Sequence, residues 1–155
     1  MKLRIVALGH KLPGWVGAAY EDYARRFSRD FSLELVELKP EARDRGKTTE
    51  QILAAEAARI AGATKGFFVV ALDERGLHWT TTHLASALSD WRERGLAVAF
   101  VIGSADGLAA TLKRDADITL AISALTLPHG LARVLLAEQL YRAVSMLSGH
   151  PYHRE

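Results

Sequence analysis

Five short runs of apolar residues recur along the chain, separated by longer segments of mixed polarity. Short runs rich in Val, Ile and Leu are typical of strands that are buried on both faces of a parallel sheet. One run is different, because Glu34 and Glu37 interrupt its apolar positions and indicate a strand nearer the edge of the sheet. The predicted strands are Leu3–Leu8, Phe31–Leu38, Gly66–Leu72, Ala97–Ile102 and Ile118–Ala121.

Between these runs, apolar residues recur at the spacing of an amphipathic helix. Strands that alternate with helices predict an α/β protein with a mostly parallel sheet and helices on both faces. The 155 residues fit one domain, 1–155, and we expect only Lys39–Thr48 and the last seven residues to be flexible. The predicted helices are Val16–Phe27, Thr49–Ala61, Thr82–Arg94, Leu108–Arg114 and Leu131–Leu147.

The last predicted helix is apolar on more than one side, and Glu138, Arg142 and Ser145 form its only polar stripe. A helix with this pattern must be buried on more than one side. Packing against a second copy of the chain would bury it, so we expect a twofold homodimer. The alternative is burial within a single chain.

Composition argues against several kinds of site. The chain has no cysteine, which excludes thiolate catalysis, disulfides and cysteine-bound metals. Its six histidines show no metal-ligand spacing, so we expect no metal. No apolar run has the length of a signal peptide or a membrane helix, and we expect a soluble, cytoplasmic protein with no membrane partner.

Two phosphate-binding motifs are incomplete. Gly46-Lys47-Thr48 resembles the end of a phosphate loop, but Glu41 occupies the place of the first glycine, and Thr48 or Thr49 is better explained as a helix cap. The segment that begins at Gly9 lacks G-x-G-x-x-G, the main signature of a dinucleotide site. The net charge of +2 says little about nucleic acid, and two basic clusters favour an anionic partner only weakly: Arg25, Arg26, Arg29 and Arg43, Arg45, Lys47.

Three predicted strands end in candidate ligand loops, at 72–76, 103–107 and 122–127. In an open α/β sheet, ligands bind at the carboxyl ends of the strands. Gly103 and Gly107 permit close approach of a ligand to the main chain, and the small side chains of 122–127 leave their own amides accessible. Asp106 is alternatively a cap for the helix that follows.

Further along the chain, specific motifs carry a family resemblance. They are Ile122-Ser-Ala-Leu-Thr-Leu-Pro-His129, Leu140-Tyr-Arg-Ala143 and His150-Pro-Tyr-His-Arg-Glu155. With Arg133 and Glu138, they closely resemble the ribosomal large-subunit RNA methyltransferase H family of the SPOUT class, and the likeness covers the whole chain. One departure is Ser104, where the family usually has the second of two glycines.

The resemblance implies a trefoil-knotted α/β homodimer that uses S-adenosyl-L-methionine to methylate N3 of a pseudouridine in 23S rRNA. It further implies that main chain and small side chains hold the methyl donor. The implied donor-binding residues are Leu72, Gly103, Ile122, Ser123, Ala124, Leu125, Thr126 and Leu127.

The tail and the last helix supply the hypothetical catalytic and RNA-binding groups. We expect His153 to accept the N3 proton, and Arg142 and Arg154 to steady phosphate or developing negative charge. Tyr152 would stack on a base, and Arg133 and His129 would contact the substrate. Because the chain is small and weakly basic, we expect it to need the assembled ribosome. The alternatives are a flavodoxin-like nucleotide or flavin module and an inactive ribosome-assembly factor.

Overall fold

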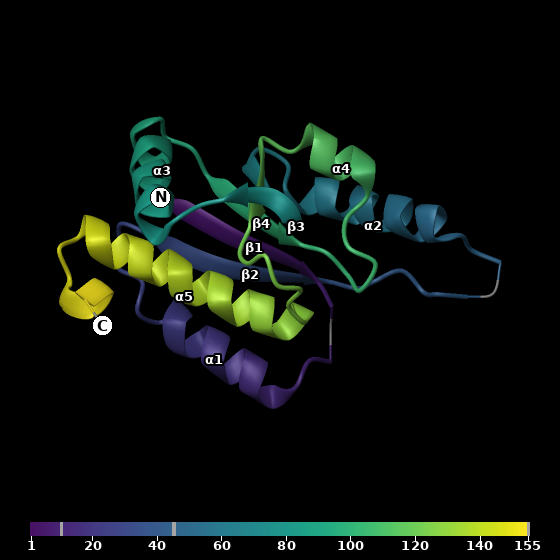
Figure 1. Cartoon of the computed structure of the whole chain (residues 1–155), viewed down its shortest axis with the longest axis horizontal. Coiled ribbons are helices and arrows are strands. Elements are labelled where there is room, and N and C mark those ends of the chain that lie inside the picture. Colours follow the sequence, from purple (N-terminus) through teal and green to yellow (C-terminus); the bar gives the residue numbers. More distant parts are fainter. Residues whose placement is uncertain (10, 45, 155) are drawn as a thin grey trace.

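The computed structural model describes residues 1–9, 11–44 and 46–154. These residues form a five-stranded sheet in the order β2-β1-β4-β3-β5, and all neighbouring strands are parallel (Figure 1). The edge position of β2 confirms the reading of its glutamate-interrupted pattern. The strands are β1 Lys2–Leu8, β2 Ser32–Leu38, β3 Phe68–His78, β4 Val98–Ile102 and β5 Ile118–Ala121.

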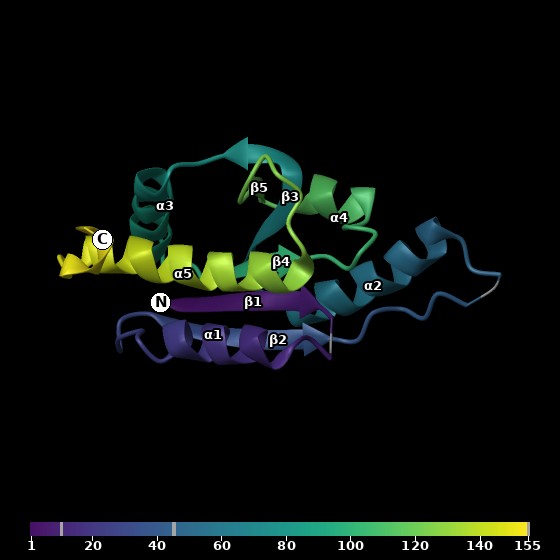
Figure 2. The same ribbon diagram turned by 60° about the horizontal axis from the view of Figure 1, so that its bottom comes forward.

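Helices cover both faces of the sheet, as predicted (Figure 2). Side chains alternate between the two faces along a strand. Leu3 and Ile5 of β1 accordingly belong to one core, which includes residues of α1, α3 and α5, whereas Val6 and Leu8 belong to a second core beside α2 and α4. The helices are α1 Gly14–Ala24, α2 Thr49–Ala63, α3 Thr81–Glu93, α4 Ala110–Asp115, α5 His129–Leu147 and the short 3₁₀ helix η1 Pro151–Arg154.

Strand β3 extends six residues beyond its predicted end at Leu72. Residues 73–76 are polar or glycine, a composition that is unfavourable in strands and typical of a turn. They form a bulge, because both Leu72 and Leu77 pair with Leu120 of β5. A Cβ on Gly76 would lie 2.7 Å from the Leu120 carbonyl carbon, so the close approach of the two strands requires a glycine there.

Helix α5 lies between α1 and α3 on one face of the sheet (Figure 1). Its residues Leu136, Leu140 and Val144 are buried within the single chain. Intrachain packing, the alternative left open by the sequence, therefore explains most of its apolar surface. Leu131 and Leu135 stay half-buried. The homodimer remains a prediction, with less support from the apolar pattern of this helix than the sequence suggested.

The C-terminal tail up to Arg154 is more ordered than we expected, because η1 packs on the end of α5, and Glu155 lies outside the described residues. The Tyr152 ring lies edge-on to Tyr141, with centroids 4.7 Å apart. The segment Lys39–Asp44 has no regular structure, but Arg59 of α2 donates a hydrogen bond to the Lys39 carbonyl oxygen at 2.8 Å. Across the described residues, no helix has the length and apolar character that a membrane crossing requires.

Candidate functional site

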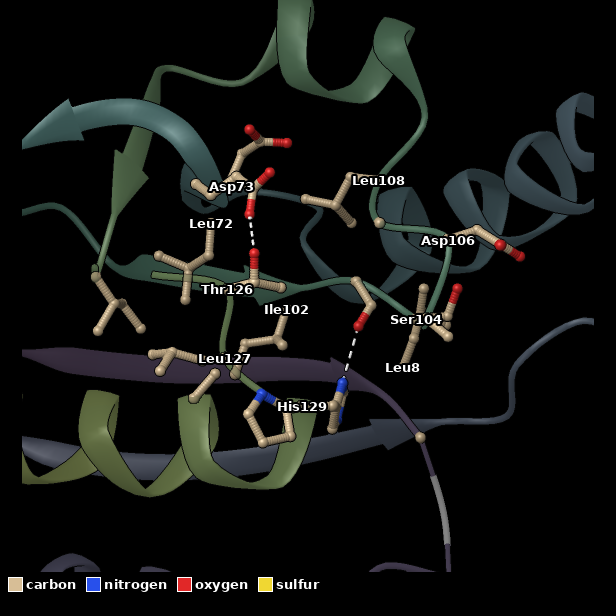
Figure 3. A pocket seen from close by; sticks show the side chains of 18 of the residues that line it. Leu8, Leu72, Asp73, Ile102, Ser104, Asp106, Leu108, Thr126, Leu127 and His129 are labelled. Atoms are coloured by element: carbon tan, nitrogen blue, oxygen red, sulfur yellow. Dashed lines mark hydrogen bonds between the residues drawn. The ribbon is translucent and has the colours of Figure 1, made fainter. Parts of the chain in front are cut away.

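A cavity of about 830 Å³ lies where the carboxyl ends of β1, β4 and β5 meet the bulge of β3 (Figure 3). Its walls come from segments that are far apart in the sequence but share one edge of the sheet. Apolar side chains such as Leu72, Ile102 and Leu108 line it beside polar groups and main chain. Its size and mixed lining are those of a small-molecule site.

Seven of the eight predicted donor-binding residues line this cavity. The exception is Ala124, which is exposed and does not line it. His129 also lines the cavity, although we had predicted that it contacts the RNA substrate. The seven are Leu72, Gly103, Ile122, Ser123, Leu125, Thr126 and Leu127.

The loop 103–107 is a tight turn that leaves no space for a side chain at Gly103. A Cβ there would lie 2.5 Å from the Gly107 carbonyl oxygen, and Gly107 itself has φ +79°. The Gly107 N–H donates to the Ser104 carbonyl oxygen at 2.9 Å, which closes the turn. The predicted capping role of Asp106 is wrong, because its carboxylate accepts two hydrogen bonds from Arg43 and α4 has no side-chain cap.

A chain of hydrogen bonds anchors this loop to α5 and to β2. The Glu37 carboxylate accepts from Arg133 at 3.0 Å, and Arg133 Nη2 lies 3.3 Å from His129 Nε2. His129 Nδ1 lies 2.8 Å from the Gly103 carbonyl oxygen, so this nitrogen must be the donor and Nε2 the acceptor of a neutral ring. Arg133 is only 2% exposed, and its Nε has no hydrogen-bond partner among the described residues.

The charged groups at the cavity are largely neutralised in pairs. Lys113 donates to Asp73 at 2.9 Å, and the Arg75 N–H donates to the same carboxylate. Burial acts to raise the pKa of Asp73, but these two donors outweigh it and lower the pKa. Thr126 donates to Glu74 at 2.8 Å and so ties the loop 122–127 to β3. Within residues 1–9, 11–44 and 46–154, no cluster of His, Asp or Glu could hold a metal ion.

The predicted catalytic residues lie at the opposite end of α5 from the cavity. Arg142 follows His129 by 13 residues on this helix, which is about 20 Å along the axis. Arg142 donates to Glu138 at 2.8 Å and lies over the Tyr152 ring at 4.8 Å. The structure thus brings Arg142 together with Tyr152 of the tail, and it separates both from the cavity of the same chain.

Two further tail residues accompany Tyr152 in η1. The His153 Nδ1–H donates to the His150 carbonyl oxygen at 2.6 Å, which leaves Nε2 as the acceptor nitrogen of the neutral ring. Arg154 is exposed. Burial and hydrogen bonding to Tyr23 and Glu138 raise the pKa of the Tyr152 hydroxyl, so this group stays protonated and donates to Glu138.

Several cavity residues were missed at the sequence level. Pro40 and Arg43 follow β2, and Leu12 follows β1. In a parallel sheet, the segments that follow the strands all begin at the same end of the sheet. The predicted strands alone would therefore have placed these residues near the cavity. Arg43 had been noted only as part of a basic cluster, whose member Arg45 lies outside the described residues.

Comparison with known proteins places this fold and site in a family. The family model described as "Predicted SPOUT methyltransferase" matches residues 1–153. Ribosomal RNA large subunit methyltransferase H from Nitrosospira multiformis is 55% identical over 155 residues, covering 99% of both chains. The protein of the same name from Burkholderia mallei is 56% identical, again covering 99% of both.

Solved structures support the same fold. A probable methyltransferase from Bordetella pertussis has a TM-score of 0.61 at 21% identity, covering 92% of this chain and 96% of its own. A probable methylase family protein from Haemophilus influenzae has a TM-score of 0.63 at 17% identity, covering 97% of this chain and 69% of its own. The fold is that of a SPOUT methyltransferase. Within that class, the chain belongs to the ribosomal large-subunit RNA methyltransferase H family.

SPOUT methyltransferases use S-adenosylmethionine, and the cavity fits this molecule. Apolar side chains can enclose an adenine ring, while the exposed main chain of 122–127 offers hydrogen bonds. The close contact of Gly103 with Gly107 keeps the wall beside β4 free of side chains at that point. The trefoil knot, which the family resemblance implies, stays a prediction.

The neutral state of His129 leads to a pH prediction. Burial and the neighbouring Arg133 hold its pKa below the ordinary 6.5, despite the hydrogen bond to Gly103. The unfolded chain therefore binds this proton more readily than the folded chain, so folding stability falls as the pH drops from 6.5 toward the folded pKa and then levels off. Above 6.5 this contribution is constant.

We expect His129→Gln to remove that part of the pH dependence. Urea unfolding of both proteins between about pH 8 and pH 5 measures the difference in unfolding free energy. The difference should be constant at the alkaline end and should shrink below the ordinary histidine pKa. Identical slopes for the two proteins would show that His129 is not held neutral.

Proposed function

We propose that this protein transfers a methyl group from S-adenosylmethionine to N3 of a pseudouridine in 23S rRNA. The observation that carries the proposal is the cavity: seven residues implied by the resemblance line one pocket at the strand ends. Relatives over 50% identical along their whole length are named as methyltransferases of large-subunit rRNA. An rRNA substrate supports the further proposal that the protein acts in the cytoplasm.

The donor supplies a methyl group on a positively charged sulfur, so the protein has to align and desolvate the reacting groups. Leu72 and Ile122 would enclose the base of the nucleoside, and the main chain of 122–127 would fix its orientation. The Thr126 to Glu74 hydrogen bond keeps this loop against β3. With the donor bound, these contacts would limit the access of water to the methyl group.

The tail would supply the proton acceptor and the RNA contacts. N3 of pseudouridine carries a weakly acidic proton that must leave during the attack, and Nε2 of His153 is available as an acceptor in the neutral tautomer. Arg154 and Arg142 would hold phosphate or the negative charge that develops on the base. Tyr152, held between Tyr141 and Arg142, would offer a ring surface to the RNA.

A single chain cannot join these two sets of residues, because they lie about 20 Å apart along a rigid helix. A second copy would solve this problem if its tail reached the cavity of the first. A twofold axis makes two such sites at once. We therefore propose that the active unit is a homodimer with composite sites.

Methyl transfer to ribosomes tests the proposed function directly. Labelled S-adenosylmethionine should label 23S rRNA in assembled ribosomes lacking the modification, and free rRNA should be a much poorer substrate because a small chain of net charge +2 depends on the shaped ribosome. Mapping the label to a pseudouridine completes the test. Equal rates on free rRNA and on assembled ribosomes would show that the enzyme does not need the ribosome. Affinity for a flavin or nucleotide without methyl transfer would favour the flavodoxin-like alternative.

Two tail variants separate catalysis from docking. His153→Ala should lower kcat by about a hundredfold with little change in ribosome binding, because only the proton acceptor is lost. Arg154→Ala should mainly weaken ribosome binding. Single-turnover rates and a pelleting assay measure the two effects. Full turnover by His153→Ala would assign the proton to another group.

Complementation between two inactive variants tests the composite site. Thr126→Trp places a large ring at the cavity from an exposed position, and His153→Ala removes the proposed proton acceptor of the tail. Each homodimer should be nearly inactive. A co-expressed mixture should recover about a quarter of wild-type activity, because half of the dimers are mixed and each has one intact site. Lack of recovery would show that each tail serves its own chain.

A further inference from the structure

Glu56 is a charged side chain that the proposed chemistry does not use, yet it is only 2% exposed. It projects from α2 beneath the glycine loop 103–107. Its Oε2 accepts a hydrogen bond from the Ser104 hydroxyl at 2.8 Å, and its Oε1 accepts one from the Glu41 main-chain N–H at 3.0 Å. Both donors are neutral groups.

A carboxylate in this setting is costly. Burying a charge without a cation destabilises the fold, and none of the ion pairs found among the described residues includes Glu56. An ionised carboxylate, however, accepts hydrogen bonds on both oxygens and donates none. It therefore suits a position where two donors from different segments have to be held at a fixed separation.

Both segments that Glu56 holds are walls of the cavity. Ser104 lines the cavity and follows Gly103 directly. Glu41 stands between Pro40 and Arg43, which line the cavity from the side of β2. The side chain of Glu41 points elsewhere, to Lys47 and Arg59, so its main-chain N–H is the part that Glu56 anchors.

We propose that Glu56 is a positioning residue for the methyl donor. Its buried carboxylate sets the distance between the glycine loop and the segment 39–44, through Ser104 on one side and the Glu41 amide on the other. Arg43 and Asp106 join the same two walls by an ion pair at the surface, where water weakens it. Glu56 is the buried link between them.

The Ser104 hydroxyl is the group that connects the glycine loop to Glu56. A glycine at 104 would remove the side-chain link between the loop and α2, and would leave only the contacts of the loop with His129 and Arg43. The hydroxyl at this position attaches the loop to α2 and limits its freedom before the donor binds. A loop that is already ordered loses less entropy on binding, which favours affinity.

Donor-binding measurements on a small set of variants test this role, which rests on the proposed function only through the use of S-adenosylmethionine. Ser104→Ala deletes the hydroxyl alone and should raise the Kd for S-adenosylmethionine about tenfold, the effect of one lost hydrogen bond to a charged group. The KM for the donor should rise with it, while kcat stays near the wild-type value. Glu56→Gln retains an acceptor for Glu41 and offers Ser104 an N–H, so it should stay within about threefold.

A double-mutant cycle shows whether Glu56 acts through Ser104. Adding Ser104→Ala to Glu56→Ala should cause little further loss of affinity, because the link is already broken. Thr48→Ala is the matched control, since this residue caps the same helix through one hydrogen bond and does not line the cavity. It should lower the melting temperature without changing the Kd.

The outcomes separate the two proposals. Wild-type affinity in Ser104→Ala would overturn the positioning role, whether or not Glu56→Ala folds. A loss of melting temperature in Ser104→Ala with unchanged Kd would also overturn it, because that is a purely structural effect. A wild-type chain that binds the donor but does not methylate ribosomes would refute the proposed function. The Kd values of the variants would still test the positioning role. A wild-type chain that does not bind the donor would overturn both.

Discussion

The parallel alignment of all five strands is the constraint on which the site depends. It brings the segments after β1, β2, β4 and β5 and the bulge of β3 to the same end of the sheet, although they are spread over more than a hundred residues. No single loop forms the cavity, because each contributes one wall. The cavity therefore depends on the order and direction of the strands more than on any single sequence motif.

Polar side chains beneath the cavity hold these walls in register. His129 fixes Gly103 from α5, Glu56 fixes Ser104 from α2, and Thr126 is tied to Glu74 of β3. The His129 and Glu56 links place polar or charged groups in half-buried or buried positions, which costs stability unless their partners are in place, whereas the Thr126 link lies between exposed residues. The buried polar links thus lower the stability of the interior, and they fix the shape of the main chain around the cavity.

The sequence predicted the elements better than the contacts between them. Strand positions, the edge location of β2 and the Thr48 cap followed from local patterns, because these depend on neighbouring residues. The extension of β3 through 73–76 was missed because polar residues in a bulge look like a turn. The pairing of Asp106 with Arg43 was missed because the two are 63 residues apart. Contacts between residues so far apart in the sequence can be identified only when the fold is known.

The length of α5 separates the cavity from the proposed RNA-binding tail. Its first turn contributes His129 to the cavity, and its last turns hold Glu138 and Arg142 against Tyr152. Because a helix of this length is rigid, α5 holds the tail at the end opposite the cavity of the same chain. The interactions of Tyr152 with Tyr141, Arg142 and Glu138 instead present η1 outward as one unit, ordered before any partner arrives. Docking a pre-ordered tail loses little entropy, so even a modest interface between two chains could complete the site.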